Sequence, residues 1–175
     1  MVIWVTGLAC SGKSSLGKML FSMLKKEMPA TVLLDGDEIR SIFKSDNRQC
    51  DYSPEAREKL AWKYHEICSW LEGQKINVVC CTIGGTEKIR QANREEFSKY
   101  YEILVTVPFE LLLERDTKNL YAPALEGKLK DVVGVDIPFS APQNPDYTFE
   151  NTIPQSELAS VAEDILARVM EAKSV

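Results

Sequence analysis

The segment Gly7–Ser14, with the sequence GLACSGKS, restricts the fold of this 175-residue chain more than any other feature. It has the pattern G-x-x-x-x-G-K-[ST], follows the apolar run Val2–Val5 and precedes residues with helical periodicity. Glycine at both ends lets consecutive backbone N–H groups turn around a phosphate chain, and the following helix adds the positive end of its dipole. The alternative is a glycine turn capped by Ser11 or Ser14. The strand before the motif and the helix after it favour a phosphate-binding loop, called the phosphate loop below.

In such a loop, Lys13 reaches the β- and γ-phosphates of a nucleotide, and the Ser14 hydroxyl is a ligand of Mg²⁺. The motif therefore predicts ATP and Mg²⁺ as cofactors. We interpret Cys10 as a small side chain that fills the loop, rather than as a reactive thiol. The predicted nucleotide contacts are Gly7, Ala9, Cys10, Ser11, Gly12, Lys13, Ser14, Ser15 and Arg115.

The charge and composition limit the partners of the chain. A formal net charge of -5 and a pI near 5.1 argue against broad binding to a nucleic acid polymer or to an anionic membrane, so we expect a small-molecule substrate. Five cysteines without a CxxC pair, and a single histidine, disfavour a disulfide framework or a zinc site. The sequence shows no signal peptide pattern and no membrane-spanning run. We therefore expect one domain over residues 1–175 in the reducing cytoplasm.

Apolar runs alternate with stretches of helical periodicity along most of the chain. The expected strands are 2–5, 31–34, 76–82, 102–107 and 147–152, and the expected helices are 13–27, 38–43, 54–73, 86–100, 108–113 and 155–172. This alternation predicts an α/β fold of the P-loop NTPase, nucleotide-kinase-like class, with helices flanking a parallel five-stranded sheet. Residues 116–145 are charged, rich in Gly and Pro, and without a clean period. We expect them to form a lid loop over the active site.

Polar residues follow the predicted strands at the edge where a parallel sheet binds ligands. Asp35 and Asp37 come after the second strand, Arg40 lies one turn further, and Lys118 enters the lid. With the phosphate loop they indicate a phosphoryl-transfer site, which needs positive charge around the moving group and a carboxylate near the attacking hydroxyl. Either aspartate can supply that carboxylate. The alternative for this turn is that an aspartate such as Asp37 only caps the next helix.

The chain resembles the adenylylsulfate kinase family almost from end to end. The matching segments are the phosphate loop, 34–40 (LDGDEIR), Ser53 with Arg57, 115–116 (RD), 118–121 (KNLY), 134–136 (GVD) and 138–142 (PFSAP). The resemblance implies transfer of the ATP γ-phosphoryl group to the 3′-hydroxyl of a nucleotide whose 5′-phosphate carries a second acidic group. It implies that Asp37 is the base or orients the hydroxyl, and that Asp35 helps to place Mg²⁺. Arg40 and Lys118 would contact the acceptor, and with Asp37 and Lys13 they form the predicted catalytic set.

The departures from this family fall, by the resemblance, in segments around the acceptor. Tyr52 replaces a phenylalanine; Leu60, Trp62 and Lys63 replace an asparagine and two arginines; TIGG at 82–85 replaces F-I-S-P; and Val132 or Val133 replaces a second phenylalanine. The predicted acceptor contacts are Asp37, Arg40, Tyr52, Arg57, Ile83, Gly84, Lys118 and Val132.

In adenylylsulfate kinases the two replaced phenylalanines sandwich the acceptor adenine, and losing one aromatic face costs about 1–3 kcal/mol of stacking. The replacements favour a smaller pyrimidine base stacked on Tyr52, with Trp62 or Lys63 in the space that a purine needs. The leading hypothesis is therefore a kinase of cytidine diphosphoramidate, an activity of capsule biosynthesis that resembles this family.

Adenylylsulfate or another nucleotide as acceptor remains open, and so does a noncatalytic nucleotide-binding switch. Retention of Asp37, Arg40 and Lys118 argues against the switch. The family also contains many dimers, so a homodimer is one alternative for the oligomeric state.

Overall fold

The computed structural model describes residues 1–43 and 51–172. The elements are, in chain order, β1 (Val2–Gly7), α1 (Lys13–Glu27), β2 (Thr31–Asp35), α2 (Gly36–Ile42), α3 (Pro54–Gly73), β3 (Asn77–Thr82), α4 (Glu87–Glu96), β4 (Tyr100–Thr106), α5 (Phe109–Glu114), α6 (Tyr121–Leu125), β5 (Tyr147–Glu150), the 3₁₀ helix η1 (Gln155–Glu157) and α7 (Leu158–Glu171). Within the described residues, no helix has the length and apolarity needed to cross a membrane.

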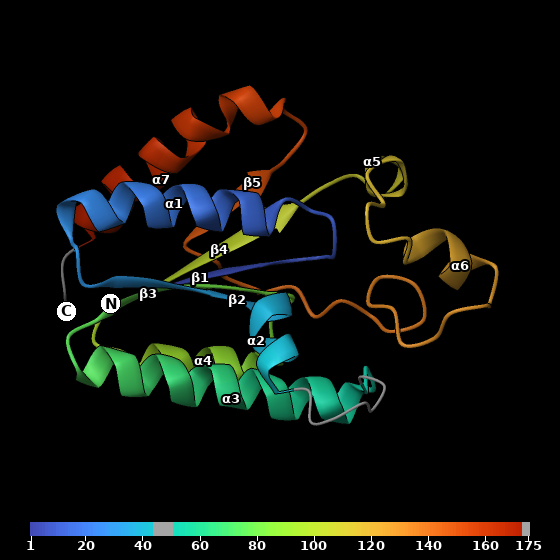
Figure 1. Cartoon of the computed structure of the whole chain (residues 1–175), viewed down its shortest axis with the longest axis horizontal. Helices are drawn as coiled ribbons and strands as arrows, with labels where there is room; N and C mark the ends of the chain where they lie inside the picture. The colour runs from blue at the N-terminus through green and yellow to red at the C-terminus, as the bar shows by residue number, and fades with distance from the viewer. Residues whose placement is uncertain (44–50, 173–175) are drawn as a thin grey trace.

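The five strands form one parallel sheet in the order β2-β3-β1-β4-β5, which confirms the predicted fold class. β1 is the central strand and is buried along its whole length, as expected for a strand covered on both faces. Figure 1 shows α1 and α7 on one face of the sheet and α3 and α4 on the other. The phosphate loop follows the central strand, so it lies in the middle of the edge where the strands end.

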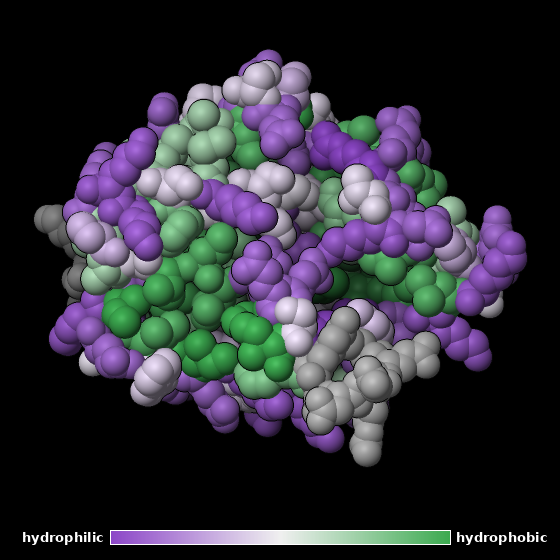
Figure 2. Space-filling view, in the orientation of Figure 1, coloured by the Kyte–Doolittle hydropathy of each residue, from purple (hydrophilic) through white to green (hydrophobic). Residues whose placement is uncertain are grey.

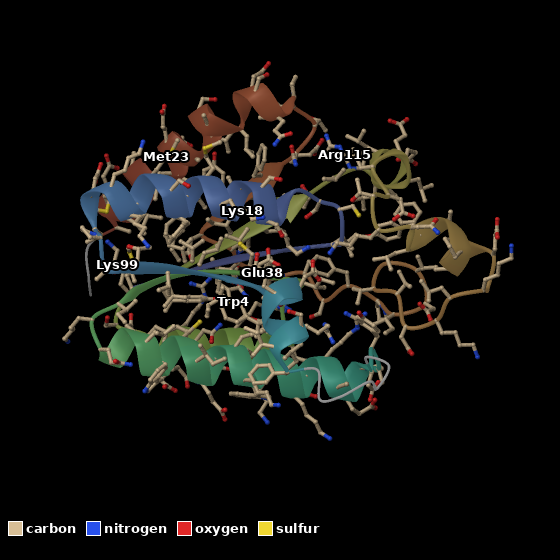
Figure 3. The ribbon with its side chains drawn as sticks, viewed as in Figure 1. Trp4, Lys18, Met23, Glu38, Lys99 and Arg115 are labelled. Carbon is tan, nitrogen blue, oxygen red and sulfur yellow. The ribbon has the colours of Figure 1, made fainter. Side chains whose placement is uncertain are left out.

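Alternate residues of β1 belong to two different hydrophobic cores. Ile3 and Val5 pack with residues of α1 and α7, whereas Val2 and Trp4 pack with residues of α3. Figure 3 shows Trp4 between the sheet and α3. The strand therefore links both helical layers and is held in place from both sides.

Several boundaries differ from the sequence prediction for identifiable reasons. The helix expected over 86–100 ends at Glu96 because Phe97 is extended and buried, and β4 already begins at Tyr100, which pairs with Val2. The helix expected from residue 38 begins at Gly36, where the side chain of Asp35 caps it. Short-range periodicity does not reveal these boundaries, since they depend on a cap and on pairing with a distant strand.

The lid segment, residues 116–145, is more ordered than the absence of a sequence period suggested. The carboxylate of Asp116 accepts hydrogen bonds from the backbone N–H groups of Leu120 (2.9 Å) and Tyr121 (2.8 Å), and α6 begins there. Tyr121 is fully buried in a third hydrophobic cluster, with Leu112 and Val132. Figure 1 shows α5 and α6 together beyond the edge where the strands end. We call this cluster, with Ala9 and Ala124, the lid root.

Candidate active site

The phosphate loop turns tightly from β1 into α1. Gly12 has a left-handed backbone with φ of +92°, and a Cβ there would collide with the side-chain amide of Asn151. That amide donates a hydrogen bond of 2.8 Å to the carbonyl of Ser11. At Gly7, a Cβ would lie 2.8 Å from Ser11 Oγ. Glycine is therefore required at both positions, by close approach and, at Gly12, also by backbone conformation.

Two polar groups inside this loop have few protein partners. Ser11 Oγ is buried and has no hydrogen-bond partner among the described residues. Lys13 is 9% exposed, and its Nζ donates a hydrogen bond of 3.0 Å to the carbonyl of Leu8. Burial and the charge of Lys118 lower the pKa of Lys13. Phosphate oxygens in the loop would satisfy the Ser11 hydroxyl and stabilise the Lys13 ammonium, so these residues fit a nucleotide phosphate chain.

The turn after β2 separates its two aspartates. Asp35 is 6% exposed, and its Oδ1 accepts a hydrogen bond of 2.9 Å from the backbone N–H of Asp37. Asp35, and not Asp37, therefore caps α2, which corrects the capping alternative considered for Asp37. The Tyr64 hydroxyl donates to the carbonyl of Gly36 at 3.0 Å and holds the same turn against α3.

Asp37 is more exposed and forms an ion pair with Lys118 of the lid. Burial alone would raise the pKa of Asp37, but the hydrogen bond and the charge of Lys118 hold it below its usual value. Asp37 is therefore an ionised carboxylate at the place where the lid meets the sheet edge.

A cavity of about 270 Å³ lies between the phosphate loop, the turn after β2, the start of α3, the loop after β3 and the lid. The charged or polar side chains on its wall include Lys13, Ser14, Asp35, Asp37, Arg40, Arg57 and Lys118. The apolar side chains include Leu60, Ile83, Val133, Ile137 and Phe139. In Figure 2 the surface is hollowed on the side of the lid, with apolar residues inside the hollow. The cavity is thus lined by both charged and apolar side chains, a combination that suits a nucleotide. Below, these two sets of residues are called the charged wall and the apolar wall.

Most of the predicted acceptor contacts line this cavity, namely Asp37, Arg40, Arg57, Ile83, Gly84 and Lys118. Tyr52 does not. Its ring is 43% exposed and contacts two guanidinium groups, those of Arg40 at 4.7 Å and Arg57 at 5.4 Å from the ring centroid. Tyr52 therefore packs on the two arginines that line the cavity instead of facing it.

Val132 does not line the cavity either, because it is buried in the lid root. Val133 lines the cavity instead. Adjacent residues of an extended segment point to opposite sides, so only one of the two valines can face the cavity. The sequence analysis left open which valine replaces the family phenylalanine but named Val132 as the acceptor contact; in the structure Val133, and not Val132, lines the cavity.

The expectation that Trp62 or Lys63 occupies the acceptor space is wrong. Leu60 and Tyr64, one helical turn apart on α3, line the cavity, so the residues between them point elsewhere. The Trp62 ring packs edge-on against His65, with centroids 5.4 Å apart, and Lys63 Nζ lies 4.6 Å from the Phe43 ring centroid.

The predicted nucleotide contact Arg115 lies outside the cavity, at the end of α5 (Figure 3). It donates a hydrogen bond of 2.9 Å to the carbonyl of Asn151, whose side chain supports the phosphate loop at Ser11. Ser15 lies on α1, just after the phosphate loop, and does not line the cavity. The remaining predicted contacts lie in the phosphate loop, and of these Ala9, Lys13 and Ser14 line the cavity.

Phe139 and Asn151 are among the residues at this site that sequence reasoning missed. Phe139 lies on the apolar wall, although only Tyr52 was considered as an aromatic stacking face. Asn151 follows β5 and supports the phosphate loop. The sequence analysis looked for polar side chains at the end of the second strand. The same search at the end of every predicted strand would have found Asn151 as well.

A glycine-rich loop between a buried parallel strand and a helix, with a charged cavity beside it, defines a P-loop phosphotransferase. Residues 1–150 match the family model described as Adenylylsulphate kinase, and the chain belongs to that family. This confirms the resemblance found in the sequence.

The relatives include two named enzymes. The chain is 37% identical over 142 residues to the cytidine diphosphoramidate kinase of Campylobacter jejuni, covering 81% of each protein. It is 32% identical over 156 residues to the adenylyl-sulfate kinase of Myxococcus xanthus, covering 87% of this chain and 82% of the relative. These relatives support an ATP-dependent phosphotransferase that acts on a nucleotide, and they leave no support for the noncatalytic switch.

The fold agrees with a solved structure of the same family. The Mycobacterium tuberculosis APS kinase in complex with AMPPNP and APS matches with a TM-score of 0.84 and 24% identity, covering 98% of this chain and 97% of that one. At this identity the likeness establishes the fold alone.

Proposed function

We propose that this kinase transfers the γ-phosphoryl group of ATP to the 3′-hydroxyl of cytidine diphosphoramidate. The observation that carries the proposal is the lining of the cavity, where Leu60, Thr82, Gly84 and Gly85 replace family residues while the charged wall keeps the family pattern. The similarity to the Campylobacter jejuni cytidine diphosphoramidate kinase supports the same acceptor.

The backbone of the loop after β3 requires both of its replaced residues, Gly84 and Gly85, to be glycine. Gly84 has φ of +97°, and a Cβ there would collide with Thr6 Oγ1. At Gly85, a Cβ would lie 2.7 Å from Ile89 Cδ1 and 3.2 Å from Ala61 Cβ. The Ser-Pro pair of adenylylsulfate kinases does not fit this backbone, so the loop beside the acceptor has its own course in this chain.

The charged wall supports the roles expected from the sequence. Asp37 is ionised and accessible, so we assign to it the acceptor hydroxyl, as base or orienting group. We assign Lys13 to the β- and γ-phosphates, and the contact of Lys118 with Asp37 supports a role for Lys118 beside the acceptor hydroxyl.

Arg40 and Arg57 would bind the 5′ anhydride group of the acceptor. Burial and the neighbouring charge of Arg40 lower the pKa of Arg57. An anion bound between Arg40 and Arg57 would compensate the buried charge of Arg57 and reduce the repulsion between the two guanidinium groups. Guanidinium groups also donate paired hydrogen bonds to phosphate-like oxygens. In the protein alone, both guanidinium groups lie against the Tyr52 ring.

Mg²⁺ fits beside the phosphate loop, because Ser14 and Asp35 both line the cavity. A hydroxyl and a carboxylate are hard oxygen ligands of the kind that Mg²⁺ prefers, and Asp35 uses only Oδ1 for the cap of α2. When bound, the ion neutralises charge on the phosphate oxygens.

The test is a comparison of kcat/KM for cytidine diphosphoramidate and adenylylsulfate at fixed ATP and Mg²⁺. We expect at least about tenfold preference for the cytidine acceptor, which corresponds to about 1.4 kcal/mol of differential transition-state binding. Preference for adenylylsulfate by the same factor would replace the proposal with adenylylsulfate kinase activity, which the relative from Myxococcus xanthus favours.

A further inference from the structure

Arg90 on α4 is among the largest fully buried side chains of the described residues, and it does not line the cavity. Its guanidinium donates to the carbonyl of Gly85 at 2.6 Å, to the carbonyl of Ser140 at 3.1 Å and to the Ser140 hydroxyl at 3.1 Å. Nε donates to Glu87 Oε2 at 3.0 Å. One side chain therefore connects the loop after β3 to the lid segment.

Both connected segments form the apolar wall of the cavity. Gly85 follows Ile83 in the loop after β3, and Ser140 follows Phe139 in the lid, 50 residues beyond Arg90. No hydrogen bond among the described residues joins these two segments directly. Nη1 of Arg90 donates to the carbonyls of both Gly85 and Ser140, and Nη2 donates to the Ser140 hydroxyl. The guanidinium therefore bridges the residues next to Ile83 and Phe139, and its rigid planar geometry limits how far these two segments can separate.

A buried carboxylate behind Arg90 fixes its position. Glu102 on β4 is 1% exposed, and its Oε1 lies 4.0 Å from Arg90 Nε. The other oxygen of Glu102 pairs with Arg94 at 3.1 Å. Arg90 is thus held on one side by charge, while its other side faces the two segments of the wall.

We propose that Arg90 is a positioning residue that sets the width of the acceptor-base pocket, by holding Ile83 and Phe139 at a fixed separation. This inference rests on the proposed function insofar as the cavity binds the acceptor nucleotide. A pocket of fixed width accepts one base size, whereas a loose one discriminates less between pyrimidine and purine.

Arg90→Lys tests the proposal because it keeps the buried charge, but its side chain is shorter and has one nitrogen, so it cannot form all three hydrogen bonds in the planar geometry of the guanidinium. We expect the KM for the acceptor to rise about tenfold, as for the loss of charge-assisted hydrogen bonds that hold a binding wall, while the KM for ATP changes less than about twofold. The preference between cytidine and adenosine acceptors should decrease as well. Ser140→Ala removes one arm only, so it should change the same quantities in the same direction by less.

The matched control is Arg94→Lys. Arg94 lies on the same helix and pairs with the same Glu102, and the other partners of Arg94, Asp146 and Asn144, lie outside the cavity. It should lower the free energy of unfolding without raising the acceptor KM. If Arg90→Lys behaves like Arg94→Lys, or raises the KM of ATP and acceptor equally, Arg90 is merely structural and the inference fails. The measurement uses whichever nucleotide the unmodified enzyme prefers, so a wrong acceptor in the proposed function does not affect this outcome.

Discussion

Asp37 at the sheet edge and Lys118 of the lid form an ion pair. Since burial alone would raise the pKa of Asp37 and Lys118 opposes this, Lys118→Ala should raise the pKa of Asp37. Carbon-13 NMR titration of the carboxyl group measures this shift, and an unchanged pKa would show that Lys118 does not contact Asp37 in solution.

The same pair predicts a pH dependence. The folded pKa of Asp37 lies below its unfolded value, so the pair stabilises the fold above the unfolded pKa and this contribution is lost as the pH falls through the folded pKa. Because both side chains are partly exposed, the contribution to stability is small. In Lys118→Ala, the acid limb of the pH profile of kcat/KM should move to higher pH, because a base with a raised pKa is protonated over a wider range.

The two aspartates of the turn after β2 can be separated by matched substitutions. Asp35→Asn keeps an oxygen for the cap of α2, so stability should change little while the Mg²⁺ concentration for half-maximal activity increases. Asp37→Asn should lower kcat by about 10²–10⁴ with little change in the KM for ATP, as for the loss of a base. The reverse pattern, with Asp37→Asn altering the Mg²⁺ dependence, would exchange the two roles.

At the scale of elements, the lid has two parts. The lid root packs on the phosphate loop, and other lid residues, such as Lys118 and Val133, line the cavity. The Tyr121 hydroxyl donates to the carbonyl of Ala9 at 2.9 Å, which ties α6 to the phosphate loop. Arg57 donates to the carbonyl of Asp131 at 2.7 Å and ties the next part of the lid to α3. We therefore expect α6 to be rigid without ligands and the cavity-lining parts of the lid to become ordered when ligands bind.

Hydrogen exchange should distinguish them. Residues 121–125 should be protected without ligands because Tyr121 and Ala124 are buried, whereas ATP and acceptor analogues should slow exchange at Lys118–Leu120 and 130–133. Tyr121→Phe should lower the free energy of unfolding by about 0.5–1.5 kcal/mol, the usual contribution of one hydrogen bond, and speed exchange in α6. Exchange that does not respond to ligands in either part would mean a static loop.

At the scale of the whole molecule, the central strand joins two cores, and we propose that they unfold as one domain. The three tryptophans, Trp4, Trp62 and Trp70, all lie on β1 or α3, and Trp4 belongs to the α3 core. Ile165 is fully buried in the opposite core on α7. Ile165→Ala should lower the free energy of unfolding by about 2–5 kcal/mol. Tryptophan fluorescence and far-UV circular dichroism should report the same midpoint. A fluorescence transition that does not respond to Ile165→Ala would show two independent units.

The sequence alone determined the parallel sheet, the place of the phosphate loop and the family, because these depend on local signals. The motif Gly7–Ser14 is contiguous, and a buried strand reads as a continuous apolar run. Asp37, Arg40 and Lys118 were found for a related reason, since the ends of parallel strands meet at one edge.

Only the tertiary structure decided which side chains form the apolar wall. The choice of Val133 over Val132 and the burial of Arg90 depend on contacts between segments far apart in the sequence. A helical or extended residue has the same local pattern whichever neighbour it meets, so burial and partner choice follow from packing and not from periodicity. For the same reason, the sequence predicts which residues carry the phosphoryl-transfer chemistry better than it predicts the residues that shape the pocket of the acceptor base.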